Sequence, residues 1–150
     1  MNNEEFLDWK QNLGSIDPYE NEKDCEIFFR LLSKVEGQLD GPIIDALLGT
    51  FTNADDYGVQ ERVMVILDGA DPSEYASRLA AGFEGLIRRS SEKEWPLIIL
   101  GRIFNSDDLL LINAIVDAAR NNQVLREFMR SDEFLEEYPE VEGILNSAGI

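Results

Sequence analysis

Histidine is absent from the 150-residue sequence, and cysteine occurs once, as Cys25. Without histidine, the chain lacks imidazole acid–base catalysis, the Ser–His and Cys–His nucleophile pairs and most kinds of zinc site. A single cysteine forms no internal disulfide, so the fold does not depend on an oxidising compartment. The N-terminus is acidic, unlike a signal peptide, and no apolar run approaches the roughly 20 residues that span a bilayer. We therefore expect a cytoplasmic protein that is not inserted in a membrane.

Positive charge is scarce as well. The sequence has 13 Lys and Arg residues against 30 Asp and Glu residues, for a formal net charge of -17. Nucleic acids and anionic membranes are both bound through clustered basic side chains, so this charge disfavours both as partners. Hydrophobic residues still make up 44% of the chain, which is enough for a packed core. Residues 1–150 are therefore predicted to form one folded acidic domain.

Apolar residues recur at three- and four-residue spacing almost throughout the chain, and strand-type alternation is absent. This periodicity predicts an all-α fold. The expected helices cover about Asn3–Asn12, Cys25–Leu39, Pro42–Phe51, Val59–Leu67, Asp71–Ile87, Ser91–Phe104, Leu109–Arg120, Gln123–Met129 and Phe134–Leu145. The helix over Leu109–Arg120 is apolar nearly all round, and we expect it to be the most buried.

Helix-start signals support these boundaries. Asp71 can cap a helix whose first position is Pro72, and Glu74 can reach back to the cap. Ser91 followed by Glu94 predicts a second capping box. Because the connections are short, consecutive helices should be antiparallel neighbours. The architecture is then a set of helix hairpins, arranged either as in HEAT-type solenoids or as an irregular α-bundle.

An antiparallel path places alternate loops at the same end of the molecule. One end should collect Asp17, Glu20, Glu22, Asp55, Asp56, Glu92 and Glu94, and the other Glu36, Asp40, Asp68, Asp71, Asp107 and Asp108. Both ends are acidic, so topology alone does not choose a working surface. Tyr57 lies beside the first group and belongs to a residue type enriched at interfaces. The candidate partner-binding residues are Glu20, Glu22, Asp55, Asp56, Tyr57, Glu92 and Glu94.

The acidic surface has three interpretations: solubility alone, metal binding, or docking of a basic protein. No loop has the ligand spacing of a calcium site, so we expect neither a metal nor a cofactor. Most acids fall on polar helix faces or in loops, and no nucleophile is paired with a base, so we expect no enzymatic activity. Trp95 is expected in the core, Arg102 at its edge holding a carbonyl or carboxylate, and Gly101 where a neighbouring helix approaches closely.

The segment EWPLIILGRIFNS, Glu94–Ser106, resembles the signature segment of immunity protein family 30, a family of bacterial antidotes in polymorphic-toxin systems. That signature has a tryptophan, an apolar helical run and an Arg-Ile-apolar-Asn stretch, matched here by Trp95, Arg102, Ile103 and Asn105. The likeness extends over about Asp68–Leu111, and Pro96 departs from the pattern. The resemblance implies a cytoplasmic antidote that binds one cognate toxin domain, with contact-dependent inhibition as one delivery route.

An acidic antidote suits a toxin with a basic cleft, such as a nuclease, and we expect an RNase rather than a DNase. The sequence thus favours a non-enzymatic inhibitor that neutralises its toxin through acidic surface complementarity. The alternative is an acidic HEAT-like adaptor or scaffold protein that binds a peptide or protein along a helical face.

Overall fold

A computed structural model describes residues 1–19, 21–54, 58–92 and 94–150. Within these ranges the chain is helical and contains no strand, which confirms the all-α prediction. The helices are α1 (Asn3–Ser15), α2 (Glu22–Val35), α3 (Gly41–Leu48), α4 (Val59–Leu67), α5 (Pro72–Arg89), α6 (Trp95–Phe104), α7 (Leu109–Arg120), α8 (Gln123–Met129), α9 (Asp132–Glu137) and α10 (Glu140–Ala148).

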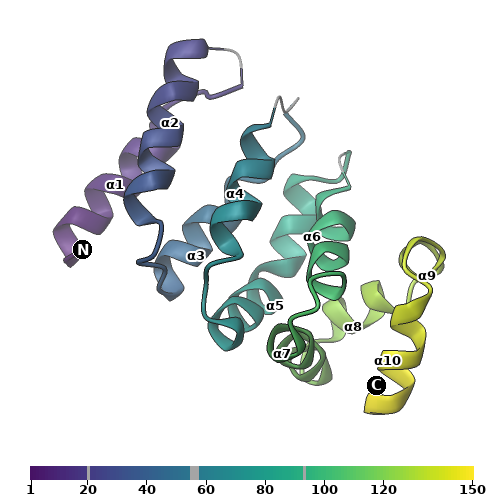
Figure 1. The fold of residues 1–150 in the computed structure, drawn as a ribbon. Helices are drawn as coiled ribbons and strands as arrows, with labels where there is room; N and C mark the ends of the chain where they lie inside the picture. Colours follow the sequence, from purple (N-terminus) through teal and green to yellow (C-terminus); the bar gives the residue numbers. More distant parts are fainter. Residues whose placement is uncertain (20, 55–57, 93) are drawn as a thin grey trace.

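Consecutive helices pack as pairs, and the pairs follow one another along an arc with the two termini at its opposite ends (Figure 1). Helices α3, α5 and α7 lie side by side in one layer, and α2 packs on α4 in another. The central helix is α5, which contacts α3, α6, α7 and α8. Helix lengths range from 6 residues in α9 to 18 in α5, so the hairpin stack is irregular.

The helix starts follow the local signals in part. Asp71 accepts a hydrogen bond from the backbone N–H of Glu74 at 3.0 Å, as expected. The carboxylate of Glu74 does not return to the cap, because it accepts from Arg78 Nε at 3.1 Å. The Ser91 capping box is wrong: α6 begins at Trp95, and its N-cap residue makes no side-chain cap hydrogen bond. Pro96 explains this start, since proline is favoured in the first turn of a helix.

The expected last helix, Phe134–Leu145, is interrupted at a proline. The structure divides it into α9 and α10, with Tyr138 and Pro139 between them. Pro139 has no N–H to continue the ladder of α9, and its ring disfavours helical geometry at the preceding Tyr138. Similarly, α2 ends at Val35, short of Leu39, and the chain then turns through Gly37 at a positive φ of 81°.

The more buried of the helices α6 and α7 is α6, contrary to the prediction for Leu109–Arg120. In α6 only Ile98 and Arg102 reach the surface, and the other eight residues are buried. In α7, Leu109 and Leu110 are 71% and 74% exposed, so this helix is not the most buried. Its buried residues recur at helical spacing from Leu111 to Ala119, and α5 is the helix on which α7 mainly packs.

The residues expected to support the fold do so. Trp95 is 8% exposed, and its ring lies 5.5 Å from that of Phe51, centroid to centroid. Both carboxylate oxygens of Asp68 accept from the guanidinium of Arg102, with Nε distances of 3.1 and 3.2 Å. Gly101 admits the ring of Tyr138, which a Cβ at this position would overlap.

Candidate functional site: an acidic loop edge

The connections that lead into α2, α4 and α6 lie at one end of the hairpin stack (Figure 1). We call residues 16–19, 49–54 and 90–92, together with the acidic helix starts Glu22 and Glu94, the loop edge. Of the predicted partner-binding residues, Glu22, Glu92 and Glu94 belong to this edge and are exposed. The other four, Glu20, Asp55, Asp56 and Tyr57, lie outside the described residues. The described part therefore places three of the predicted residues on one edge.

Hydrogen bonds join the first and second connections of the loop edge. Tyr19 donates its hydroxyl proton to the carbonyl oxygen of Thr50 at 3.0 Å. The side-chain amide of Gln60, on α4, donates to Tyr19 Oη at 2.8 Å and to the same Thr50 carbonyl at 3.1 Å. Gln60 is fully buried, so these contacts form away from water, where a hydrogen bond is electrostatically stronger. The first two loops are therefore held in one arrangement.

A further hydrogen bond joins the second and third connections. The side-chain oxygen of Asn53 accepts from the backbone N–H of Glu92 at 2.8 Å, across 39 positions of sequence. This contact fixes the backbone that carries Glu92. Asn53 and Gln60 were both missed by sequence reasoning, and the only trace of Gln60 is a polar residue inside the apolar stripe of α4.

The acidic side chains of the two ends are used differently. At the opposite end, Asp40, Asp71 and Asp108 cap α3, α5 and α7, and Asp68 is paired with Arg102. At the loop edge, the carboxylates of Glu22, Glu92 and Glu94 make no hydrogen bond or ion pair with any described residue. Carboxylates that their own fold does not use, on a fixed backbone, are available to basic groups of another molecule.

The negative field continues from the loop edge toward the C-terminal helices. Burial raises the pKa of Tyr138, and the charges of Glu137, Glu140 and Glu94 raise that pKa further because they oppose a phenolate. The charge of Glu94, at the loop edge, therefore acts on Tyr138 between α9 and α10.

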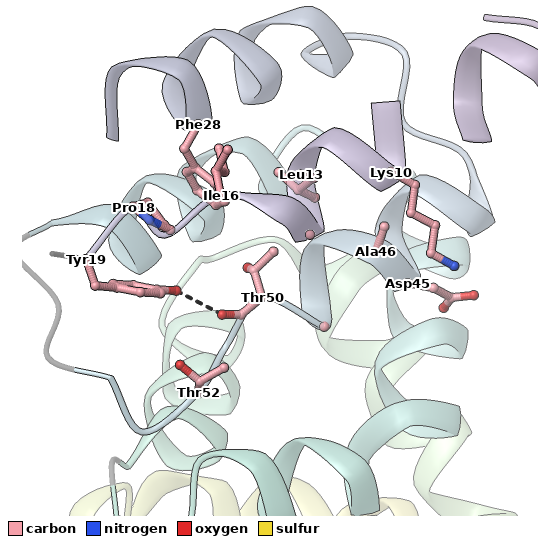
Figure 2. A pocket seen from close by; sticks show the side chains of 12 residues that line it. Lys10, Leu13, Ile16, Pro18, Tyr19, Phe28, Asp45, Ala46, Thr50 and Thr52 are labelled. Carbon is pink, nitrogen blue, oxygen red and sulfur yellow. Dashed lines mark hydrogen bonds between the residues drawn. The ribbon is translucent and has the colours of Figure 1, made fainter. Parts of the chain in front are cut away.

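A pocket of about 500 Å³ opens beside the loop edge, between α1, α2 and α3 (Figure 2). Leu13, Ile16, Phe28 and Ala46 form its apolar part. Thr52 and the hydrogen-bonded pair of Tyr19 and Thr50 line the side nearest the loop edge, and Lys10 and Asp45 lie together at the far side (Figure 2). The pocket and the loop edge thus share residues.

Within residues 1–19, 21–54, 58–92 and 94–150, no group of three or more Cys, Asp or Glu side chains is arranged to hold a metal ion. None of the helices described in the structure is long and apolar enough to cross a bilayer.

No family model, curated protein or solved structure matches the chain. A function is therefore inferred from the loop edge and its pocket.

Proposed function

We propose that this protein is an immunity protein, a non-enzymatic inhibitor that binds a basic toxin domain through its loop edge. The observation that carries the proposal is the contrast between the two acidic ends. Most carboxylates of the opposite end cap helices or pair with Arg102, whereas Glu22, Glu92 and Glu94 have no partner among the described residues. Acids that stabilise their own fold offer little to a partner, and acids held ready on a fixed frame offer a complementary surface.

The overall charge supports the same partner. A net charge of -17 accelerates the approach of a positively charged protein and repels nucleic acid. Nuclease toxins carry basic clefts that bind phosphate groups, and an acidic surface can occupy such a cleft. We propose that the toxin is a basic nuclease, an RNase rather than a DNase, and that the antidote acts in the cytoplasm.

The resemblance of Glu94–Ser106 to immunity protein family 30 is compatible with separate scaffold and partner-binding residues in this chain. Trp95 is buried and Arg102 holds Asp68, so these residues maintain the scaffold. Partner choice then rests with the loop edge, whose sequence the scaffold does not dictate. An antidote for one cognate toxin needs such an independent surface.

Co-expression with the C-terminal toxin domain encoded immediately upstream tests the proposal. We expect rescue of growth and a complex that remains intact during size-exclusion chromatography. Glu92→Lys should weaken rescue. Glu36→Lys is an equal charge change at the C-terminal end of α2, away from the loop edge, and should weaken rescue less. Growth arrest despite soluble expression of both proteins would contradict the immunity function.

A HEAT-like adaptor is the second candidate, and the stack of helix hairpins favours it (Figure 1). An adaptor would bind an extended segment along the helix faces rather than at the loop edge. Hydrogen exchange of a purified complex separates the two. Protection confined to residues on α3, α5 and α7 favours the adaptor, and protection of residues 49–54 and 90–92 favours the inhibitor.

A further inference from the structure

The pocket beside the loop edge has the composition of a site that receives an apolar group. Its wall is formed by Leu13, Ile16, Phe28 and Ala46, from α1, α2, α3 and the connection between α1 and α2 (Figure 2). The volume of about 500 Å³ falls within the range of roughly 300–1,000 Å³ typical of ligand pockets. It therefore has room for a large side chain.

The surroundings of this pocket are negatively charged. Asp17 follows Ile16 in the connection before α2, and Asp45 lines the far side, where it is paired with Arg78 at 2.8 Å. The carboxylate of Asp24 lies near Asp17, because it accepts a hydrogen bond from the backbone N–H of Asp17 at 2.9 Å. Lys10 is the one cation among the described residues that line the pocket. Asp17 and Asp24, which form no ion pair with any described residue, and the net charge of -17 favour an occupant whose neighbouring groups are positively charged.

An interface formed by the loop edge alone would bind weakly. Exposed charges raise the association rate and select the partner, but they contribute little affinity because water and salt screen them. Most of the binding energy of an interface comes from a few large side chains buried in pockets. The frame of Tyr19, Gln60 and Thr50 joins the pocket to the loop edge, so one partner can engage both.

We propose that this pocket receives one large apolar or aromatic side chain of the basic partner, flanked in that partner by Lys or Arg. The inference rests on the proposed function, because it assigns the anchor of the same interface. The flanking cations face Asp17 and Asp24, and the anchor side chain lies against Ile16, Phe28 and Ala46. The pocket contributes affinity, and the loop edge contributes attraction and orientation.

Short peptides of defined sequence test the pocket directly. The probes are three fluorescein-labelled heptapeptides with amidated C-termini: a basic tryptophan peptide, KKKWKKK; a basic glycine peptide, KKKGKKK; and a neutral tryptophan peptide, SSSWSSS. Binding is measured by fluorescence anisotropy. We expect the basic tryptophan peptide to bind about tenfold tighter than the basic glycine peptide, because burying one large side chain contributes an effect of that size or more. The neutral tryptophan peptide should bind weakest, since it lacks the cations.

A matched pair of variants assigns the difference to the pocket. Ala46→Leu fills the pocket and should remove the preference for tryptophan while leaving the affinity for the basic glycine peptide unchanged. Ala81→Leu makes the same change on the exposed surface of α5 and should keep the preference. Methyl chemical shifts of wild-type protein provide a second readout, with changes expected at Leu13, Ile16 and Ala46 on addition of the basic tryptophan peptide.

Each contrary outcome has its own meaning. Equal affinity of the two basic peptides, or a tryptophan preference that survives Ala46→Leu, refutes the pocket and leaves the loop edge as the docking surface. Tight binding of the neutral tryptophan peptide indicates an uncharged apolar ligand and refutes the basic occupant. If neither basic peptide binds, the basic partner is itself refuted. Failure of the co-expression rescue, by contrast, refutes the immunity function without bearing on the peptide results.

Discussion

The close approach of α6 to the segment between α9 and α10 gives a sharp test of the packing. Gly101 lies in the middle of buried α6, and a Cβ there would overlap the ring of Tyr138. Neither side yields readily: Leu100 and Ile103 are buried on α6, and the Tyr138 ring packs on Phe134 with centroids 5.2 Å apart. Gly101→Ala must therefore displace the Tyr138 ring.

The expected magnitude combines two opposing effects. An alanine inside a helix ordinarily stabilises by roughly 0.5–1 kcal/mol relative to glycine, and overpacking a core costs roughly 1–3 kcal/mol. Gly101→Ala should thus lower the free energy of unfolding by about 1 kcal/mol. Gly82→Ala is the matched control, because Gly82 is exposed in the middle of α5 and a Cβ added there would meet no described atom within 4 Å. This control should gain stability.

Urea unfolding of four proteins measures the effect: the wild type, Gly101→Ala, Tyr138→Ala and the double variant. Without the Tyr138 ring, Gly101→Ala should become stabilising, like Gly82→Ala, so the cycle should give a coupling energy of about 1–3 kcal/mol. The reasoning is refuted if Gly101→Ala stabilises the wild type, or if its cost persists in the Tyr138→Ala background.

Other predictions concern the core and its titration. Trp9→Phe should lower the free energy of unfolding by about 1–3 kcal/mol more than Trp95→Phe in urea melts, because Trp9 Nε1 donates to a backbone carbonyl at 2.9 Å and the buried Trp95 N–H has no partner among the described residues. Burial first, and then a nearby carboxylate, raise the pKa of Tyr75; stability should therefore be retained below about pH 10 and fall as pH rises above it, more steeply than in Tyr75→Phe. Leu110→Ala should change the free energy of unfolding by less than about 0.5 kcal/mol, whereas Leu111→Ala should lower it by about 2–5 kcal/mol. Similar losses for the two variants would contradict the burial pattern.

Local signals predicted the helices well where neighbours in sequence decide the outcome. Asp71 caps α5 as predicted, because its side-chain oxygen reaches the N–H group three residues ahead. The same reasoning failed at Ser91, where the fixed geometry of Pro96 sets the start of α6. It also failed for the burial of α7, since composition could not tell that Leu109 and Leu110 would be exposed.

The candidate site was predictable only in part. Alternation of short connections placed Glu22, Glu92 and Glu94 at one end, and the structure agrees with that placement. The choice between the two acidic ends depended on contacts between residues distant in sequence. The Asp68–Arg102 pair and the hydrogen bonds of Gln60 and Asn53 join positions 34, 41 and 39 apart, so no local pattern reveals them.

The most direct test of the account is the association rate of the protein with the toxin domain, measured by stopped flow from low to high salt. We expect the rate to fall steeply with ionic strength for the wild type and for Glu36→Lys. Glu92→Lys should associate roughly three- to tenfold more slowly at low salt, with a shallower salt dependence. Equal rates and equal salt slopes for Glu92→Lys and the wild type would contradict the assignment of the loop edge as the docking surface.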